Sequence, residues 1–328
     1  MLGGSSGVPG VVLSHPLIQV FQDLTILVFA PGVSGAISQI EARLQGRRGP
    51  RILQPYYDLA KLFRKESLMP ADAGWVFLAA PVVAFTCYLV VPLLVPVLTT
   101  FPLPLGYMGD ILGGAFLLTL AGFAVALAAA ETNSPYAQLG SSRAMTFSSL
   151  IEPSLLFVTF GVALITTTDL PYAEAAAGRA SFAAAIRPAH LLAALAFFLV
   201  VLADTGRIPV ETHTGTLEFG MIDEARTFEY SGPALALIRW GSNMKQLILY
   251  VLLANVFSAP WGLAGSGRLG SVLLAVVILL GKALAIGTLF TLIDNSFSKL
   301  RLFKITEFMA AAFLLSVLAV LVLFLGGG

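Results

Sequence analysis

The sequence predicts an all-α integral membrane protein of about eight transmembrane helices. Two compositional features carry this prediction: 57% of the 328 residues are hydrophobic and only 11% are charged, whereas soluble domains carry roughly 25% charged residues. A third observation is that the apolar residues gather in runs close to the length of a bilayer-spanning helix. No Pro- or Ser-rich linker divides the chain, so residues 1–328 are predicted to form a single polytopic membrane domain.

The composition also bounds the chemistry of the chain. A single cysteine, Cys87, excludes an intrachain disulfide and any all-cysteine iron–sulfur cluster within this chain. Three scattered histidines (His15, His190 and His213) do not favour a zinc cage. We therefore expect no catalytic residue, metal site or redox cofactor in this chain, and a net charge of +1 gives no indication of a nucleic-acid partner.

Eight apolar runs are the candidate membrane spans. The first contains Asp23 and the turn-prone Pro31-Gly32 pair, which predicts a tilted or broken helix, and the fifth is short and continues toward Asp204. The first ten residues lack a basic region, which argues against a cleavable signal peptide. The runs cover residues 16–37, 75–99, 111–131, 147–168, 189–203, 234–258, 271–293 and 305–326.

The distribution of Lys and Arg predicts the orientation. Fifteen of them fall in segments 38–74, 132–146, 204–245 and 294–304, and three fall in the loops of the other side. Because positively charged loops stay in the cytoplasm, these four segments are predicted to be cytoplasmic and both termini exterior.

The first cytoplasmic loop predicts an amphipathic helix over residues 53–65. Leu59, Leu62 and Phe63 share one helical face, with basic residues around it. Such a helix either anchors the chain at the membrane surface or forms a docking platform for a soluble partner. A basic turn precedes it and favours a fixed geometry; its docking candidates are Arg47, Arg48 and Arg51.

The second informative segment, 204–232, is unusually acidic for a membrane protein. Its acids alternate with large apolar residues, so the segment is expected to fold back into the protein with its acids lining a polar cavity, which is where non-helical backbone is tolerated at membrane depth. A solvated loop is the alternative. The acids are Asp204, Glu211, Glu218, Asp223, Glu224 and Glu229.

Ionisable residues inside membrane spans are costly and are often functional. We expect a buried acidic relay of carboxyl groups that exchange protons near neutral pH; the alternative is that Glu131 and Asp204 only mark the headgroup level. Lys282, central in the seventh run, is expected to pair with an acid on another helix. The relay candidates are Glu131, Glu152, Asp204, Glu218, Asp223, Glu224, Glu229 and Lys282.

Other polar residues have plainer interpretations. Arg143 and Arg207 are expected to pair with acids at the cytoplasmic rim as structural or docking residues. His213 titrates near neutral pH in its free form, although a lone histidine is more often a hydrogen-bonded structural residue. Asp23 is polar at depth and either lines a cavity or faces a partner subunit.

Four ordered motifs resemble a known family. Residues 47–50 (RRGP) with the following QPYYDLAKLFRKE resemble the first cytoplasmic loop of the H-type membrane subunit of respiratory complex I. LGSSRAMTFSSLIEPSL (139–155), DTGRIP (204–209) and EYSG (229–232) resemble further elements of that protein, in the same order.

The departures favour one branch of this family. After the proline of DTGRIP, Thr214 and Thr216 stand where the quinone-reducing members have acids, and Glu218 remains. The stretch THTGTLEFGMIDEARTFEYSGP and the later DNSFSKLRLFKITEF (294–308) are more similar to the anchor subunit of group 4 membrane-bound [NiFe] hydrogenases, the formate hydrogenlyase and hydrogenase-4 type.

The resemblance implies a non-catalytic subunit in a prokaryotic plasma membrane that couples electron transfer to H⁺ or Na⁺ translocation. It implies partners that hold the Ni-Fe and iron–sulfur centres: hydrogenase large and small subunits, ferredoxin-like subunits, and antiporter-like membrane subunits. One alternative is the quinone-site subunit of a complex I-type oxidoreductase, with a chamber among spans one, five and six. A stand-alone transporter is the other, and the lack of a clear inverted repeat of broken helices counts against it.

Overall fold

The computed structural model describes residues 14–70, 73–101, 103–107, 111–166, 188–205, 225–258, 261–296 and 302–325. These residues form long α-helices with short connections, and strand pairing among them is limited to one isolated bridge, Thr99 to Ala264. The long helices are α1 (His15–Leu44), α3 (Trp75–Leu94), α4 (Ile111–Glu131), α5 (Pro135–Thr166), α8 (Pro188–Asp204), α9 (Gly232–Leu252), α10 (Leu269–Ser296) and α11 (Leu302–Leu325). The shorter helices are α2 (Gln54–Phe63), two single 3-10 turns (Pro104–Tyr107 and Ala225–Thr227) and a π-helical turn (Leu253–Ser258) that continues α9.

The predicted class, an all-helical membrane protein, is confirmed. Each of the eight apolar runs coincides with a long helix, and α1, α3, α4, α5 and α10 are long and apolar enough to cross a membrane.

The structure excludes one local alternative, a broken first helix, and corrects one local expectation. The first helix is continuous from His15 to Leu44 despite Pro31, and residues 135–146, predicted as loop, form the first turns of α5. In the second case Pro135 stands at the first helical position, where its missing N–H costs nothing, and the polar turns that follow extend the helix beyond the apolar run.

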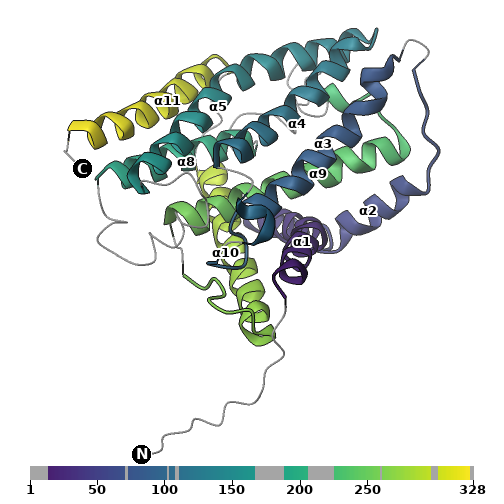
Figure 1. Cartoon of the computed structure of the whole chain (residues 1–328). Coiled ribbons are helices and arrows are strands. Elements are labelled where there is room, and N and C mark those ends of the chain that lie inside the picture. The colour runs from purple at the N-terminus through teal and green to yellow at the C-terminus, as the bar shows by residue number, and fades with distance from the viewer. Residues whose placement is uncertain are drawn as a thin grey trace, which may run out of the picture.

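The helices pack in two groups (Figure 1). Helices α3, α4, α5, α8 and α11 lie side by side, while α1 packs on α9 and α10, and α10 is steeply tilted against the first group. Helix α9 joins the groups, because it also contacts α3. Glycines permit the closest approaches: a Cβ at Gly241 of α9 would lie 2.8 Å from Cδ2 of Tyr88 in α3.

Side chains of neighbouring helices compensate the proline in α1. Pro31 has no N–H to donate to the carbonyl of Leu27 one turn earlier. The indole Nε1 of Trp240 in α9 donates to that oxygen at 2.9 Å, and the hydroxyl of Tyr56 in α2 donates to the carbonyl of Val28 at 2.5 Å. Pro31 therefore weakens the helix without breaking it.

The same contacts fix the predicted amphipathic helix, which is confirmed as α2. Leu59 is buried, and the ring of Phe63 meets Trp240 edge-on at 6.1 Å. The preceding turn is equally tight, since a Cβ at Gly49 would lie 2.9 Å from the Cβ of Ala42. Helix α2 is thus rigidly docked on α1 and α9.

At the other end of the bundle, buried side chains satisfy an irregular backbone stretch after α3. Gln22 donates to the carbonyls of Pro92 (2.6 Å) and Val95 (3.1 Å) and accepts from the N–H of Leu98 (3.1 Å). Asn255, in the π-helical turn, donates to the carbonyls of residues 96 and 97. Non-helical backbone is tolerated at such depth when it is enclosed and satisfied in this way.

Candidate functional site

The first turns of α3, α5 and α9 meet at one end of the bundle, together with the end of α4. Glu131, the last residue of α4, accepts from the N–H of Phe77 at 2.8 Å, and the hydroxyl of Tyr230 donates to the carbonyl of Phe77 at 2.9 Å. Gly232 lies against the backbone of Glu66, which follows α2 at this end, and loop 45–53, with its cluster of arginines, leads into α2. We call this end the basic side.

Glu131 acts on a helix end. Its carboxylate lies at the N-terminus of α3, where unpaired N–H groups and the helix dipole favour a negative charge. Gly74 leaves the room for it, because a Cβ there would overlap the carboxylate. Burial and the Glu131 carboxylate together raise the pKa of the Tyr230 phenol well above its usual value.

A separate cluster of charges lies deeper in the bundle. Lys245 Nζ of α9 and Asp204 Oδ1, at the end of α8, are 2.6 Å apart, and both side chains are more than four-fifths buried. Glu152 of α5 lies within electrostatic range of both members of this pair. Lys245 also interacts electrostatically with Tyr88 of α3 and with Arg226.

The depth of this cluster follows from helix geometry. Lys245 is 13 residues beyond the start of α9, and Tyr88 is 13 residues beyond the start of α3. At 1.5 Å per residue both lie about 20 Å along their helices from the basic-side ends. Because Asp204 pairs with Lys245, α8 ends beside the middle of α9.

Lys245 is the residue that the sequence reasoning missed. The sequence places it among the cations of a cytoplasmic segment, whereas it lies inside α9, in the middle of the bundle. The available signal was a lysine within the sixth apolar run. An intramembrane cation needs an acid from another helix, and α8 supplies it.

Among the other relay candidates, Glu229 is partly buried directly before Tyr230, at the basic side, and so belongs to the rim. Lys282 of α10 donates to Asn255 Oδ1 at 3.1 Å and to the carbonyl of Trp261. These contacts place Lys282 with the polar network at the other end of the bundle. Glu218, Asp223 and Glu224 lie outside the described residues, as do Arg207 and His213.

The predicted docking residues also lie in different parts of the structure. Arg47, Arg48 and Arg51 are exposed in the turn before α2, as expected of a contact surface. Arg143 lies in α5, nine residues before Glu152. Nine residues place the two side chains on opposite faces and about 14 Å apart along the helix, so Arg143 does not form a direct pair with Glu152.

Asp23 is partly buried in α1, and its Oδ1 is enclosed without a hydrogen-bond partner among the described residues. Within that part of the chain no three His, Cys, Asp or Glu side chains gather as a metal site would require. The arrangement can hold and exchange protons or balance a cation.

The chain resembles known proteins over most of its length. A profile of the family described as NADH dehydrogenase matches residues 18–325. Formate hydrogenlyase subunit 4 of Escherichia coli (strain K12) is 32% identical over 88% of this chain and 91% of its own length. Hydrogenase-4 component C of the same organism is 31% identical over 91% and 92%.

Two further relatives widen the comparison. The H-type subunit of NADH-quinone oxidoreductase from Syntrophotalea carbinolica is 27% identical over 87% of each chain. A chain from the membrane-bound sulfane sulfur reductase, an archaeal respiratory membrane complex, has the same fold: its TM-score is 0.80, it is 21% identical, and the match covers 95% of this chain and 100% of that one.

These matches agree with the ordered motifs around Arg47, Glu152, Asp204 and Tyr230, and with the apolar helices. The chain belongs to the NADH dehydrogenase subunit 1 family of multi-pass membrane subunits, whose members include formate hydrogenlyase subunit 4, hydrogenase-4 component C and the H-type subunit of complex I.

Proposed function

We propose that this chain is a non-catalytic membrane subunit of a respiratory-type [NiFe] hydrogenase complex, and that it couples electron transfer in a peripheral arm to H⁺ or Na⁺ translocation. The observation that carries the proposal is the deep cluster of Glu152, Asp204 and Lys245. Three helices bring three ionisable groups together about 20 Å below the basic side, where isolated charges are costly.

The position of Asp204 connects the charged cluster to the segment that follows α8. Asp204 is the last residue of α8 and leads directly into the acidic segment 206–224. A movement of that segment, driven by redox chemistry in an arm docked above it, would shift Asp204 relative to Lys245. Glu152 interacts electrostatically with both Asp204 and Lys245. A change in their separation would therefore change the proton affinity of Glu152.

The basic side offers the platform for such an arm. Helix α2 is held by the bonds of Tyr56 and by the packing of Phe63 on Trp240, so its position is fixed relative to α1 and α9. Exposed arginines and exposed apolar side chains, among them Ile52 and Tyr57, share this surface. A mixed apolar and arginine-rich surface on a rigid support suits a protein partner.

The partners follow from the relatives that share the family. Two of them carry names of hydrogenase complexes, formate hydrogenlyase and hydrogenase-4. We infer that the arm consists of hydrogenase large and small subunits and ferredoxin-like proteins, which hold the Ni-Fe and iron–sulfur centres, and that antiporter-like subunits pack laterally in the membrane.

The second candidate is the quinone-site subunit of a complex I-type oxidoreductase, which the similarity to the NADH-quinone oxidoreductase relative favours. It requires a chamber that opens among α1, α8 and α9. The two relatives named for hydrogenase complexes are 32% and 31% identical to this chain, against 27% for the oxidoreductase relative. This favours the hydrogenase-type function.

One experiment separates the two candidates. The complex is purified by affinity capture through this chain, and its Ni, Fe and quinone contents are measured. The proposal predicts Ni and Fe in the preparation, H₂ evolution with a reduced artificial dye, and no bound quinone. A preparation that contains bound quinone and no Ni would establish the second candidate instead.

A further inference from the structure

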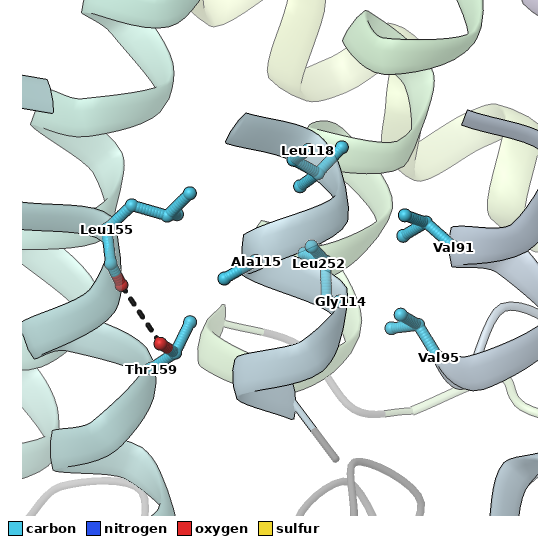
Figure 2. A pocket seen from close by; sticks show the side chains of 8 residues that line it. All are labelled: Val91, Val95, Gly114, Ala115, Leu118, Leu155, Thr159 and Leu252. Carbon is cyan, nitrogen blue, oxygen red and sulfur yellow. Dashed lines mark hydrogen bonds between the residues drawn. The ribbon is translucent and has the colours of Figure 1, made fainter. Parts of the chain in front are cut away.

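A small apolar cavity lies among α3, α4, α5 and α9 (Figure 2). Its volume is about 10 Å³, at the lower limit for one water molecule, and Thr159 is the one residue with a polar side chain in its lining. The other lining residues are Val91, Val95, Gly114, Ala115, Leu118, Leu155 and Leu252.

The cavity lies directly beyond the charged cluster. Leu155 and Thr159 follow Glu152 by three and seven residues in α5, and Val91 follows Tyr88 by three residues in α3, which ends directly before Val95. Residues spaced by three and seven share one face of a helix. Helices α3 and α5 both run away from the basic side, so the cavity lies on the far side of the cluster from the basic side.

The chemistry of the lining keeps this space dry. The hydroxyl of Thr159 already donates within its own helix, with the carbonyls of Leu155 and Leu156 both at 3.0 Å (Figure 2 shows the first contact). An enclosed water needs two to four polar partners, and this lining does not provide them. Apolar cavities of this kind remain empty of water.

We propose that this cavity is a dry barrier in series with the charged cluster. It prevents a proton that reaches Glu152 or Lys245 from leaving through this chain to the opposite surface. Protons exchanged at the cluster therefore move sideways, along the bundle or into a neighbouring membrane subunit. The inference rests on the proposed function for its role in coupling, whereas the barrier itself can be measured without turnover.

The test is the passive proton permeability of proteoliposomes that contain the purified complex, with a pH-sensitive dye inside and an imposed pH gradient. Leu118→Asn places an amide in the cavity and should raise proton influx several-fold. Leu120→Asn is the matched control, because the same change two residues away falls on the exposed face of α4. It should leave the influx at the wild-type level.

Two milder variants keep the test decisive if Leu118→Asn fails to assemble. Val95→Thr conserves shape and adds a hydroxyl, so it should also increase the influx. Gly114→Ala adds a methyl group whose nearest neighbour, Val95 Cγ2, is 3.8 Å away, so it fills space without adding polarity and should leave the influx unchanged. A wild-type influx in assembled Leu118→Asn and Val95→Thr complexes would overturn the proposal.

A double variant tests whether the barrier and the cluster are in series. Adding Glu152→Gln to Leu118→Asn should return the influx toward the wild-type rate, because the leak has to pass the cluster. A leak that persists in the double variant refutes the serial arrangement. Failure of the proposed function has a different signature: turnover-driven translocation that is unaffected by Glu152→Gln alone.

Discussion

Replacing Lys245 by methionine removes the positive member of the buried pair and leaves its two acidic neighbours facing each other. The stem of methionine fills much of the same volume, so the principal change is the lost charge. Removing one partner of a buried ion pair costs about 3–5 kcal/mol, because the other charge remains uncompensated. Both side chains retain a little exposure, 19% and 18%, so we expect the lower end, about 3 kcal/mol.

The opposite change should cost less. Asp204→Asn removes the negative member, but Glu152 remains near enough to balance the lysine. The double variant Asp204→Asn/Lys245→Met removes both charges of the pair, so neither is left without its partner. Most of the stability should therefore return. The expected order of stability is wild type, then the double variant and Asp204→Asn, then Lys245→Met.

The assay is a double-mutant cycle on the chain in detergent micelles, with unfolding driven by increasing dodecyl sulfate. We expect an interaction energy of about 0.5–3 kcal/mol between the two sites, the range for residues in direct contact. If the two losses simply add, or if Asp204→Asn is the more damaging change, the reasoning about this pair is wrong.

Three other outcomes follow from the same structure. Reversing the charge of Arg47 and Arg48 to Glu should release the peripheral arm from washed membranes, whereas retention of the whole arm at normal salt would remove these residues from the docking surface. A cysteine introduced at Trp261, in a chain whose native cysteine is buried, should react with an impermeant maleimide from outside the cell, and one at Arg48 only after permeabilisation; the reverse pattern would invert the predicted orientation. Gly74→Ala should destabilise the chain by about 1–3 kcal/mol, the usual cost of overpacking, because the new Cβ overlaps the Glu131 carboxylate; thermal unfolding in micelles measures this, and an unchanged midpoint would show that the carboxylate moves aside freely.

Much of the fold was predictable because membrane helices are encoded locally. Apolar runs of the right length identify the helices, and the helical spacing of Leu59 and Phe63 identifies α2. The continuity of α1 was not predictable in this way. It depends on Trp240, more than two hundred residues away, which occupies a carbonyl that Pro31 leaves unpaired.

The candidate site was predictable only in its parts. The sequence marks Glu152 and Asp204 as costly residues in apolar surroundings, but the pairing of Asp204 with Lys245 depends on where α8 ends beside α9. Glu131 has the same signature in the sequence, and yet it caps α3 at the basic side. The sequence pattern therefore distinguishes ionisable residues in apolar helices from those in solvent-exposed loops. Only the packing of the helices shows whether such a residue caps a helix or belongs to a buried charge pair.

The most direct test of the coupling role is the ion stoichiometry of an assembled Glu152→Gln complex. Glutamine preserves size and much of the hydrogen bonding but cannot carry an exchangeable charge. The control is Glu307→Gln, the same change at an exposed position in α11. Ion translocation is measured in inside-out vesicles during turnover, alongside hydrogenase activity with an artificial dye. We predict that Glu152→Gln leaves assembly and dye-linked activity near normal and sharply lowers the number of ions moved per turnover, while Glu307→Gln changes neither. A normal ion stoichiometry in the assembled Glu152→Gln complex would contradict the account.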